Sequence, residues 1–164
     1  MTGKISSDKS TSMTYFIYGS SFGKIVIESD GKAITMIKTA ENANPTGRES
    51  ADALTDKAAG QLEEYIKGKR QKFDIPLNPH GTDFQKAVWK ALQEIPYGET
   101  RSYKQIAQMI KNPNACRAVG LANNKNPIWI MIPCHRVIGS DGSLTGYGGG
   151  LEMKKRLLEL ERGS

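Results

Sequence analysis

The chain has 164 residues, of which 23 are lysine or arginine and 17 are aspartate or glutamate, for a formal net charge of +6. This length allows one compact domain or two small ones and excludes a large multidomain enzyme. With 38% hydrophobic and 24% charged residues, the composition supports a buried core and excludes a wholly disordered chain. No segment approaches the roughly 20 consecutive apolar residues of a membrane-spanning helix, and the N-terminus carries no secretory signal.

From Thr14 onward the pattern predicts short strands rich in Ile, Tyr and Val, at 14–18, 24–28 and 33–38. Asp30-Gly31 indicates a hairpin between the second and third strands, and residues 39–48 a loop. Apolar residues at helical spacing then predict a helix that ends near Gly68: Leu54, Ala58, Leu62 and Ile66. A short strand at 72–75 is expected to follow. This half is therefore a small antiparallel sheet with one covering helix, preceded by a frayed end at residues 1–13.

Two prolines and a glycine in residues 76–81 indicate a domain boundary, so we expect one domain over 1–80 and a second over 81–164. Capping-box pairs begin two helices of the second domain: Thr82 with Gln85, and Ser102 with Gln105. The first of these helices is expected to end at Pro96.

The rest of the second domain is predicted to be mostly helical. Helices are expected over 103–111, 115–123 and 151–161, with a break at 112–114. The apolar run 128–132 predicts a buried strand or extended segment, and the glycine-rich stretch 139–150 predicts a loop. The fold class is therefore α+β.

The positive charge is concentrated in the second domain. Residues 1–80 carry 11 basic and 10 acidic side chains, a net of +1, whereas residues 81–164 carry 12 and 7, a net of +5. No acidic residue lies between Glu99 and Asp141. Such a surface attracts polyanions, nucleic acid first, although a generic basic surface is the alternative.

The helix pair around the 112–114 break resembles a helix-turn-helix, with an ordinary helical hairpin as the alternative. Its second helix carries mostly small side chains and one long cation, Arg117, so it predicts docking without base-specific readout. Arg117 is either a solvated surface charge or a side chain that enters the duplex and fills the space of an extruded nucleotide.

The segment IPCHRV at 132–137 joins a cysteine, Cys134, to the one plausible base of this half, His135. A thiolate is a strong nucleophile at neutral pH, and it needs either a lowered pKa or a nearby base. The base would act directly or through a water, with Glu161 as the candidate that orients the imidazole. A buried structural cysteine beside a surface histidine is the alternative. With two cysteines and two histidines in the whole chain, neither a disulfide framework nor a metal-ligand pattern is expected. A free thiol favours a reducing, cytoplasmic location.

Three further residues have both a structural and a functional interpretation. Asn126 before a proline favours a turn, and its amide is also able to brace the backbone near Cys134. Tyr103 and Tyr147 are packing residues or, as phenols, proton donors for a leaving anion. The sequence GYGGG at 146–150 does not follow a strand of a nucleotide-binding unit, which excludes a dinucleotide site.

Four segments together resemble the O6-alkylguanine-DNA alkyltransferases, and they cover essentially all of residues 82–161. They are FQKAVWKALQEIPYGETRSY (84–103), RAVGLANNKNP (117–127), IPCHRVIG (132–139) and GYGGGLEMKKRLLELE (146–161). The resemblance implies an N-terminal RNase-H-like three-stranded sheet with a helix, and a mostly helical C-terminal domain that contains a helix-turn-helix. It implies DNA repair by irreversible transfer of the alkyl group from O6-alkylguanine, and from O4-alkylthymine, to the protein's own cysteine.

The resemblance also assigns roles by position. Cys134 would be the acceptor, with His135 as base through a water, Glu161 orienting it, and Asn126 holding the active-site turn. Tyr103 would protonate or hydrogen-bond the departing guanine and help rotate the nucleotide, and Arg117 would replace the extruded base. Backbone groups of Cys134, Val137 and Gly148 would recognise the guanine edge, and Tyr147 would form one wall of the pocket. The remaining expected DNA contacts are Gln85, Lys104, Asn112 and Ser140.

The implied partner is double-stranded DNA bearing O6-alkylguanine, bound by a monomer, and no cofactor is needed because the cysteine itself takes the alkyl group. Some members hold a structural zinc in the N-terminal domain, but residues 1–80 contain no cysteine and only His80, so we expect no zinc. Three other functions stay open. They are a cysteine hydrolase or acyltransferase, a DNA-binding regulator without chemistry, and a damage sensor, against which the presence of Cys134 argues.

Overall fold

The computed structural model describes residues 12–163, and the chain divides after Pro79 into two compact units. The predicted boundary fell one residue later, after residue 80. Of the predicted frayed end at 1–13, all but two residues lie outside the described part of the chain. Within that part, no helix is both long enough and apolar enough to cross a membrane.

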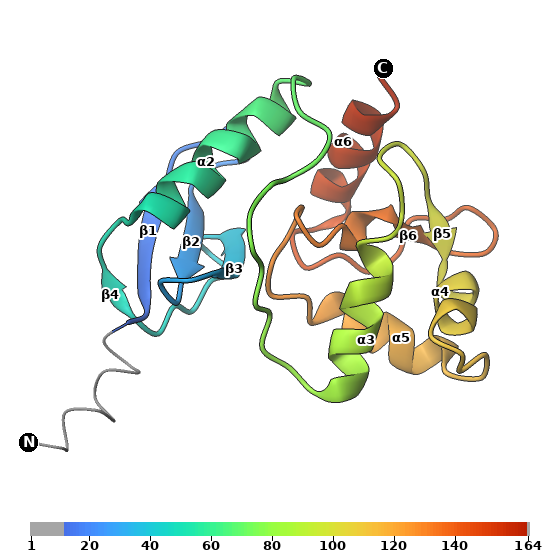
Figure 1. Ribbon diagram of the computed structural model, residues 1–164. Helices are drawn as coiled ribbons and strands as arrows, with labels where there is room; N and C mark the ends of the chain where they lie inside the picture. The colour runs from blue at the N-terminus through green and yellow to red at the C-terminus, as the bar shows by residue number, and fades with distance from the viewer. Residues whose placement is uncertain (1–11, 164) are drawn as a thin grey trace, which may run out of the picture. The chain divides into compact units, whose positions relative to one another are not determined.

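The first unit is a four-stranded sheet covered by one helix (Figure 1). Its strands are β1 (Thr14–Tyr18), β2 (Ile25–Ser29), β3 (Ile34–Thr39) and β4 (Arg48–Glu49). The order is β3-β2-β1-β4, with the first three strands antiparallel and β4 parallel to β1. The three predicted antiparallel strands and the hairpin are confirmed. At the turn, the Asp30 carboxylate accepts hydrogen bonds from the backbone N–H groups of Lys32 and Ala33.

The helix α2 (Ala53–Ile66) contains the whole predicted apolar stripe, of which Ala58 and Leu62 are buried and Leu54 and Ile66 half-buried. Asp52 caps it by accepting a hydrogen bond from the Thr55 N–H at 2.7 Å. Ala58 and Leu62 are buried with Ile27, at the centre of this unit's core. The helix is 14 residues long, so most of its stability comes from this packing rather than from intrinsic helix propensity.

Two sequence predictions for the first unit are wrong. Residues 72–75 form no strand, and the chain instead makes one isolated bridge between Leu77 and Ile34. Residues 39–48, expected to be a loop, end in β4. This strand has two exposed, charged residues, Arg48 and Glu49, so it has no hydrophobic alternation by which the sequence would reveal it.

The second unit contains four helices and a short two-stranded sheet among its described residues. The helices are α3 (Asp83–Leu92), α4 (Tyr103–Met109), α5 (Cys116–Asn124) and α6 (Leu151–Glu161). Both predicted capping boxes are present, although α3 ends at Leu92, before the expected stop at Pro96. The sequence did not predict the sheet, in which β5 (Arg101–Ser102) pairs in parallel with β6 (Val137–Ile138).

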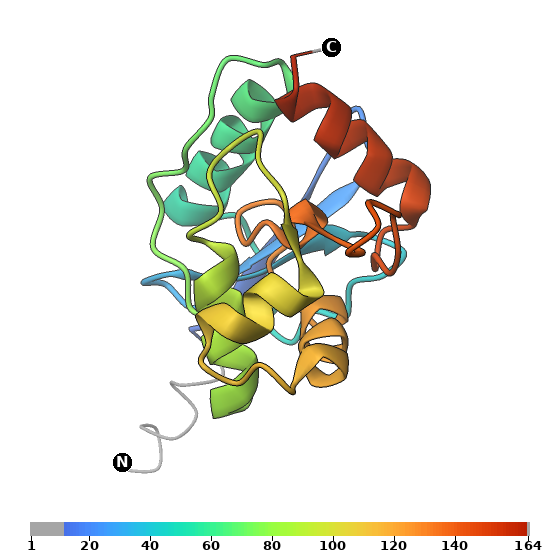
Figure 2. The same cartoon turned by 90° about the vertical axis from the view of Figure 1, so that its right-hand side faces the viewer.

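Two views agree on how this unit is arranged (Figures 1 and 2). The helices α3, α4 and α5 pack together on one side, and α6 lies on the other. The chain between α5 and α6 runs through the middle and contains one turn of 3-10 helix, η1 (Cys134–Arg136). Cys134 and His135 therefore lie between the helix pair that resembles a helix-turn-helix and the C-terminal helix.

The apolar run 128–132 is buried as predicted but is not a regular strand. Its backbone makes a γ-turn at Ile130, where the Met131 N–H donates to the Trp129 carbonyl at 2.8 Å and the Ile130 φ is 74°. A positive φ is the rarer and more strained form of this turn, and it is unfavourable for a β-branched residue. A second γ-turn at Pro133 follows, with the Cys134 N–H donating to the Ile132 carbonyl at 2.8 Å.

Candidate functional site

Cys134 opens the 3-10 turn and its side chain is buried, with 3% of the residue exposed. Burial raises the pKa of its thiol to about 11. A hydrogen bond with the Asn126 side chain and the positive charge of Lys154 oppose this rise in pKa without cancelling it. Of the two routes to a nucleophile that the sequence left open, burial opposes a lowered resting pKa and favours activation of the thiol by a base.

His135 is wholly buried, and its Nε2 lies 2.7 Å from Oε2 of Glu161 at the end of α6. Burial lowers the pKa of the imidazole, while the Glu161 carboxylate opposes that shift. The ring is therefore neutral at pH 7. Because Glu161 is ionised, Nε2 carries the proton that it donates to the carboxylate, and Nδ1 carries the lone pair of a base.

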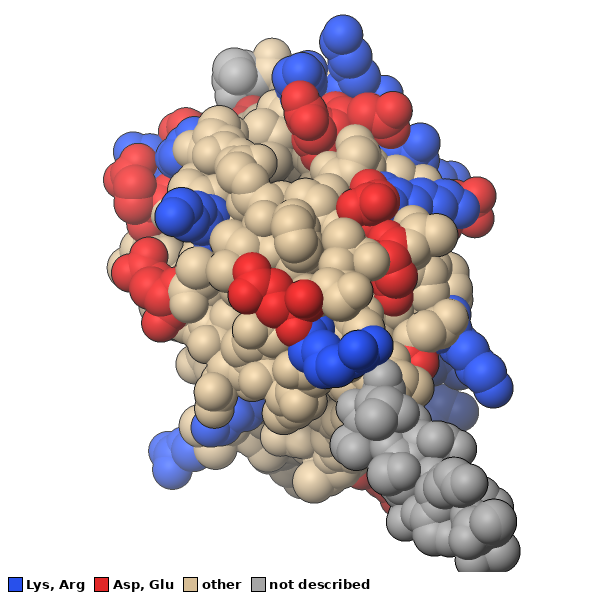
Figure 3. All heavy atoms as spheres, turned by 90° about the vertical axis from the view of Figure 1, so that its left-hand side faces the viewer, with Lys and Arg blue, Asp and Glu red and all other residues tan. Residues whose placement is uncertain are grey.

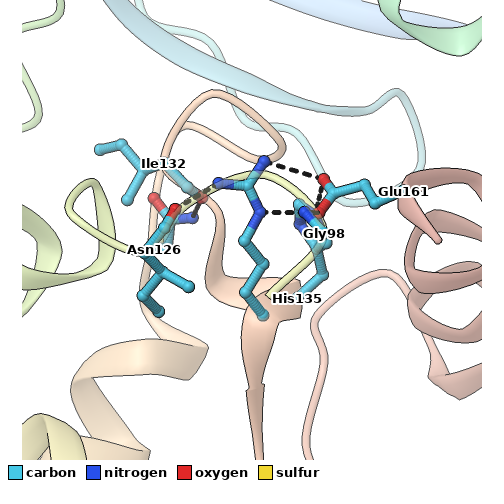
Figure 4. A network of polar contacts seen from close by, with 7 residues as sticks. Gly98, Asn126, Ile132, His135 and Glu161 are labelled. Atoms are coloured by element: carbon cyan, nitrogen blue, oxygen red, sulfur yellow. Dashed lines mark hydrogen bonds and ion pairs between the residues drawn. The ribbon is translucent and has the colours of Figure 1, made fainter. Parts of the chain in front are cut away.

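The Glu161 carboxylate is held on both oxygens by groups that the sequence did not predict (Figure 4). Arg136 donates to Oε1 at 2.8 Å and to Oε2 at 2.9 Å, and the Gly98 N–H donates to Oε1 at 3.2 Å. The third guanidinium nitrogen of Arg136, Nη1, donates to the Ile95 carbonyl at 2.7 Å. This two-point ion pair fixes the carboxylate in place and favours its ionised form.

Asn126 holds the segment that leads to Cys134 (Figure 4). Its amide nitrogen donates to the Ile132 carbonyl at 2.8 Å, and its amide oxygen accepts from the Ile128 N–H at 2.9 Å. These two bonds close the segment around the γ-turn at Ile130. A second buried amide, Asn123, donates to the Cys134 carbonyl at 3.4 Å, and the sequence analysis assigned it no role.

Tyr103 is the first residue of α4, and its phenol lies against the loop before α6. The hydroxyl donates to the Thr145 carbonyl at 3.0 Å and accepts from the Thr145 hydroxyl at 3.2 Å. A Cβ added at Gly120 of α5 would lie 3.8 Å from the Tyr103 ring, so this ring also lies over α5.

Two of the expected pocket residues, Tyr147 and Gly148, lie next to the indole of Trp129. Tyr147 is buried, and its ring centroid lies 5.6 Å from that of Trp129. A Cβ at Gly148 would lie 2.8 Å from the indole, so only glycine allows this close approach. Val137 is fully buried at the start of β6. Trp129 itself was not predicted as a site residue.

Lys154 of α6 is the other residue near Cys134 that the sequence analysis missed. It is completely buried, and its ammonium donates to the carbonyls of Val137 at 2.6 Å and Thr145 at 2.8 Å. Its signal in the sequence was its position, because Lys154, Leu158 and Glu161 recur at helical spacing on the buried face of α6.

The expected DNA contacts lie apart from these buried groups. Arg117 is exposed on α5, as are Lys104, Asn112 and Ser140. Gln85 is half-buried, and its side-chain oxygen accepts from the Thr82 N–H at 2.9 Å in the α3 capping box. Within residues 12–163, no cluster of three His, Cys, Asp or Glu side chains is arranged to hold a metal ion.

Two sequence families match the chain over nearly its whole length. Residues 13–79 match the family described as 6-O-methylguanine DNA methyltransferase, ribonuclease-like domain. Residues 83–163 match the family described as 6-O-methylguanine DNA methyltransferase, DNA binding domain. The expected fold class, a ribonuclease-like sheet and helix followed by a helical DNA-binding domain, is therefore confirmed.

Individual relatives agree with these families. The methylated-DNA–protein-cysteine methyltransferase of Methanosarcina acetivorans is 48% identical over 153 residues, which is 91% of this chain and 98% of that protein. The enzyme of the same name from Methanosarcina barkeri is 69% identical over 104 residues, 63% of this chain and 66% of that protein. The crystal structure of Mycobacterium tuberculosis OGT in complex with DNA is 47% identical, with a TM-score of 0.87, over 92% of this chain and 93% of that chain.

Proposed function

The chain belongs to the methylated-DNA–protein-cysteine methyltransferase family, and we propose that Cys134 is the cysteine that accepts the methyl group. The protein is a DNA repair enzyme that moves the methyl group of O6-methylguanine to its own cysteine. The observation that carries the assignment is the buried, neutral His135 next to Cys134 in the chain, hydrogen-bonded to Glu161.

The thiol is activated by its neighbour. Because burial keeps Cys134 protonated, the proton leaves as the reaction proceeds, through a water to Nδ1 of His135. Glu161 stabilises the positive charge that then develops on the ring, and Arg136 keeps that carboxylate ionised. Asn126 fixes the position of the sulfur by holding the segment before it.

The leaving group needs a proton donor. We assign this role to Tyr103, whose hydroxyl is bound to Thr145 and exchanges that partner for the guanine. The bond from the methyl carbon to O6 breaks and the bond from that carbon to sulfur forms. Guanine gains one proton and the protein loses the thiol proton. Water does not cleave the thioether product, so each molecule acts once.

The DNA is proposed to be held by exposed side chains of the second unit. Arg117 on α5 is exposed and free of neighbouring carboxylates in the sequence, as a side chain that enters the duplex must be. The small residues of α5 let the helix approach the phosphate backbone closely. Lys104, Asn112, Ser140 and Gln85 are proposed to contact that backbone, and Val137, Tyr147 and Gly148 to surround the extruded base. All of these groups come from one chain, so the proposed active unit is a monomer on duplex DNA.

Mass spectrometry after incubation with a duplex that contains O6-methylguanine tests the proposal. We expect a gain of one methyl group on the peptide that contains Cys134, at most one per molecule. Cys134→Ala should abolish the transfer and retain DNA binding, whereas Cys116→Ser, which removes the other and exposed cysteine, should react as the wild type does. An O4-methylthymine duplex extends the test to the second proposed substrate.

The same experiment separates the alternatives. A cysteine hydrolase or acyltransferase would release more than one product per molecule. Methyl label on the Cys134→Ala variant would show that another nucleophile reacts, and it would overturn the assignment of Cys134.

A further inference from the structure

The buried ionised side chains of the second unit do not balance in charge. Among its described residues these are Arg136, Lys154 and Glu161, which sum to +1 because His135 is neutral. Arg136 and Glu161 neutralise each other in a two-point ion pair. Lys154 forms no ion pair with any carboxylate of the described residues, and its ammonium meets only the carbonyls of Val137 and Thr145.

An uncompensated buried ammonium is costly, because its transfer out of water is repaid only by a close opposite charge or several hydrogen bonds. Ionisable groups with perturbed pKa values cluster at functional sites. The established reaction and the roles proposed above leave Lys154 without a part in the chemistry, so the chain carries this cost for another reason.

The position of the ammonium points to Cys134. Val137, which accepts the shorter of the two hydrogen bonds, follows the 3-10 turn that Cys134 opens, and its N–H donates back to the Cys134 carbonyl. We propose that the Lys154 ammonium is the counter-charge that stabilises the Cys134 sulfur once it has lost its proton. This inference rests on the proposed function in taking Cys134 as the acceptor. A thiolate at Cys134 gives the Lys154 ammonium the opposite charge that it lacks in the resting protein.

The directions of the pKa shifts of Cys134 and Lys154 agree with a pairing of the two groups. The charge of Lys154 acts to lower the pKa of the Cys134 thiol, while burial lowers the pKa of Lys154 to about 8. The other groups around the pair are His135, which is neutral, and the Arg136–Glu161 ion pair, which has no net charge. Tyr103 shares the Thr145 carbonyl with Lys154, so the same ammonium also ties the proposed proton donor to the cysteine turn.

The decisive variants separate charge from hydrogen bonding. Lys154→Gln keeps a donor for the two carbonyls and removes the charge, whereas Lys154→Arg keeps the charge. Lys155→Gln removes the exposed neighbour on α6 and is the matched control. The single-turnover rate of methyl transfer is measured from pH 6.5 to 9.5 with protein in excess over the O6-methylguanine duplex.

We expect Lys154→Gln to slow transfer at pH 7.5 at least about tenfold, because a nearby opposite charge shifts a pKa by about one unit or more. Lys154→Arg should stay within about threefold of wild type at pH 7.5, and Lys155→Gln should match wild type. The ratio of the Lys154→Arg rate to the wild-type rate should rise above pH 8, because only the wild type then loses its charge. Because this ratio compares only the wild type with Lys154→Arg, it tests the inference even if Lys154→Gln does not fold.

A Lys154→Gln rate within threefold of wild type would overturn the inference, and so would a Lys154→Arg variant as slow as Lys154→Gln at every pH. A direct measurement keeps the inference separate from the proposed function. With cysteine labelled by ¹³C at Cβ, Cys134 and Cys116 give two signals that Cys116→Ser assigns. The thiol pKa should be higher in Lys154→Gln than in the wild type. This holds even for a protein that transfers no methyl group, and an unchanged thiol pKa would refute the counter-charge.

Discussion

The protonation state of His135 is decided by competition between burial and its carboxylate partner. A histidine hydrogen-bonded to a glutamate is ordinarily favoured as the imidazolium. Here the Glu161 carboxylate is already held on both oxygens by Arg136, and the ring is wholly buried. Burial has the larger effect, so the pKa of His135 is lowered and the ring is neutral. A neutral ring is the form that accepts a proton from Cys134.

This shift predicts how stability depends on pH. The unfolded chain has a histidine pKa of about 6.5, whereas the folded pKa of His135 is lower. Between these two values the unfolded state binds a proton that the folded state does not bind. The free energy of unfolding should therefore be constant above pH 6.5 and fall on acidification below it, by up to about 1.4 kcal/mol per pH unit. Urea unfolding between pH 5 and 7.5 measures this slope.

The second histidine provides the control. His80 is exposed, so His80→Gln should keep the acid-dependent loss of stability, while His135→Gln should remove it. A wild-type protein whose free energy of unfolding is flat from pH 7 to 5 would contradict the neutral, buried ring.

At the scale of the elements, sequence patterns succeeded where the interactions are local. The capping boxes at Thr82 and Ser102 and the hairpin at Asp30 join residues three positions apart or fewer, and all were predicted. The run 128–132 was predicted as a buried strand or extended segment because all five residues are apolar. Its actual path depends on the Asn126 side chain, whose bonds no periodicity reveals.

The candidate site shows the same difference between local contacts, which the sequence reveals, and contacts between distant residues, which it does not. Cys134 and His135 are adjacent in a recognisable segment, and Glu161 was named without any geometric reason. Arg136 and Gly98 were missed, because their contacts with Glu161 join residues 25 and 63 positions apart. Contacts of this kind become visible only once α6 is packed against the 3-10 turn.

Asn126 gives the element-scale prediction. Asn126→Ala leaves the Ile128 N–H buried without a partner, while the Ile132 carbonyl keeps only the Cys134 N–H. The unpaired N–H costs about 1–3 kcal/mol and the second lost bond about 1 kcal/mol, so the free energy of unfolding should fall by roughly 2–4 kcal/mol. The positive φ of Ile130 is strained, so the segment should rearrange more readily once the bonds of Asn126 are lost. Chemical denaturation of the variant and the wild type measures the loss.

Asn124→Ala is the matched control, since Asn124 is exposed on the adjoining helix end. Its effect should stay within about 0.5 kcal/mol. Equal losses for the two variants would show that the Asn126 side chain does not hold the segment.

At the scale of the whole molecule, the two units differ in charge. Residues 1–80 have a net charge of +1 and residues 81–164 of +5. Figure 3 shows the face on the side of β1, β4 and α2, where basic and acidic side chains are interspersed. The second unit has no acidic residue between Glu99 and Asp141, a span that includes α4 and α5. The electrostatic attraction for DNA therefore belongs to the second unit.

This asymmetry predicts that lysines of the two units affect DNA binding differently. Neutralising a phosphate releases counterions, so the slope of log affinity against log salt becomes shallower by about 0.9 for each phosphate that the protein no longer neutralises. Lys104 is exposed on α4 and is a proposed backbone contact, whereas Lys57 is exposed on α2 of the first unit. Lys104→Ala should make the slope shallower by about one and weaken binding to all sequences alike, and Lys57→Ala should leave the slope unchanged. Fluorescence anisotropy with unmodified duplex DNA across a salt series measures both. If Lys57→Ala changed the slope as much as Lys104→Ala does, the DNA would be attracted by the charge of the whole molecule and not by the second unit.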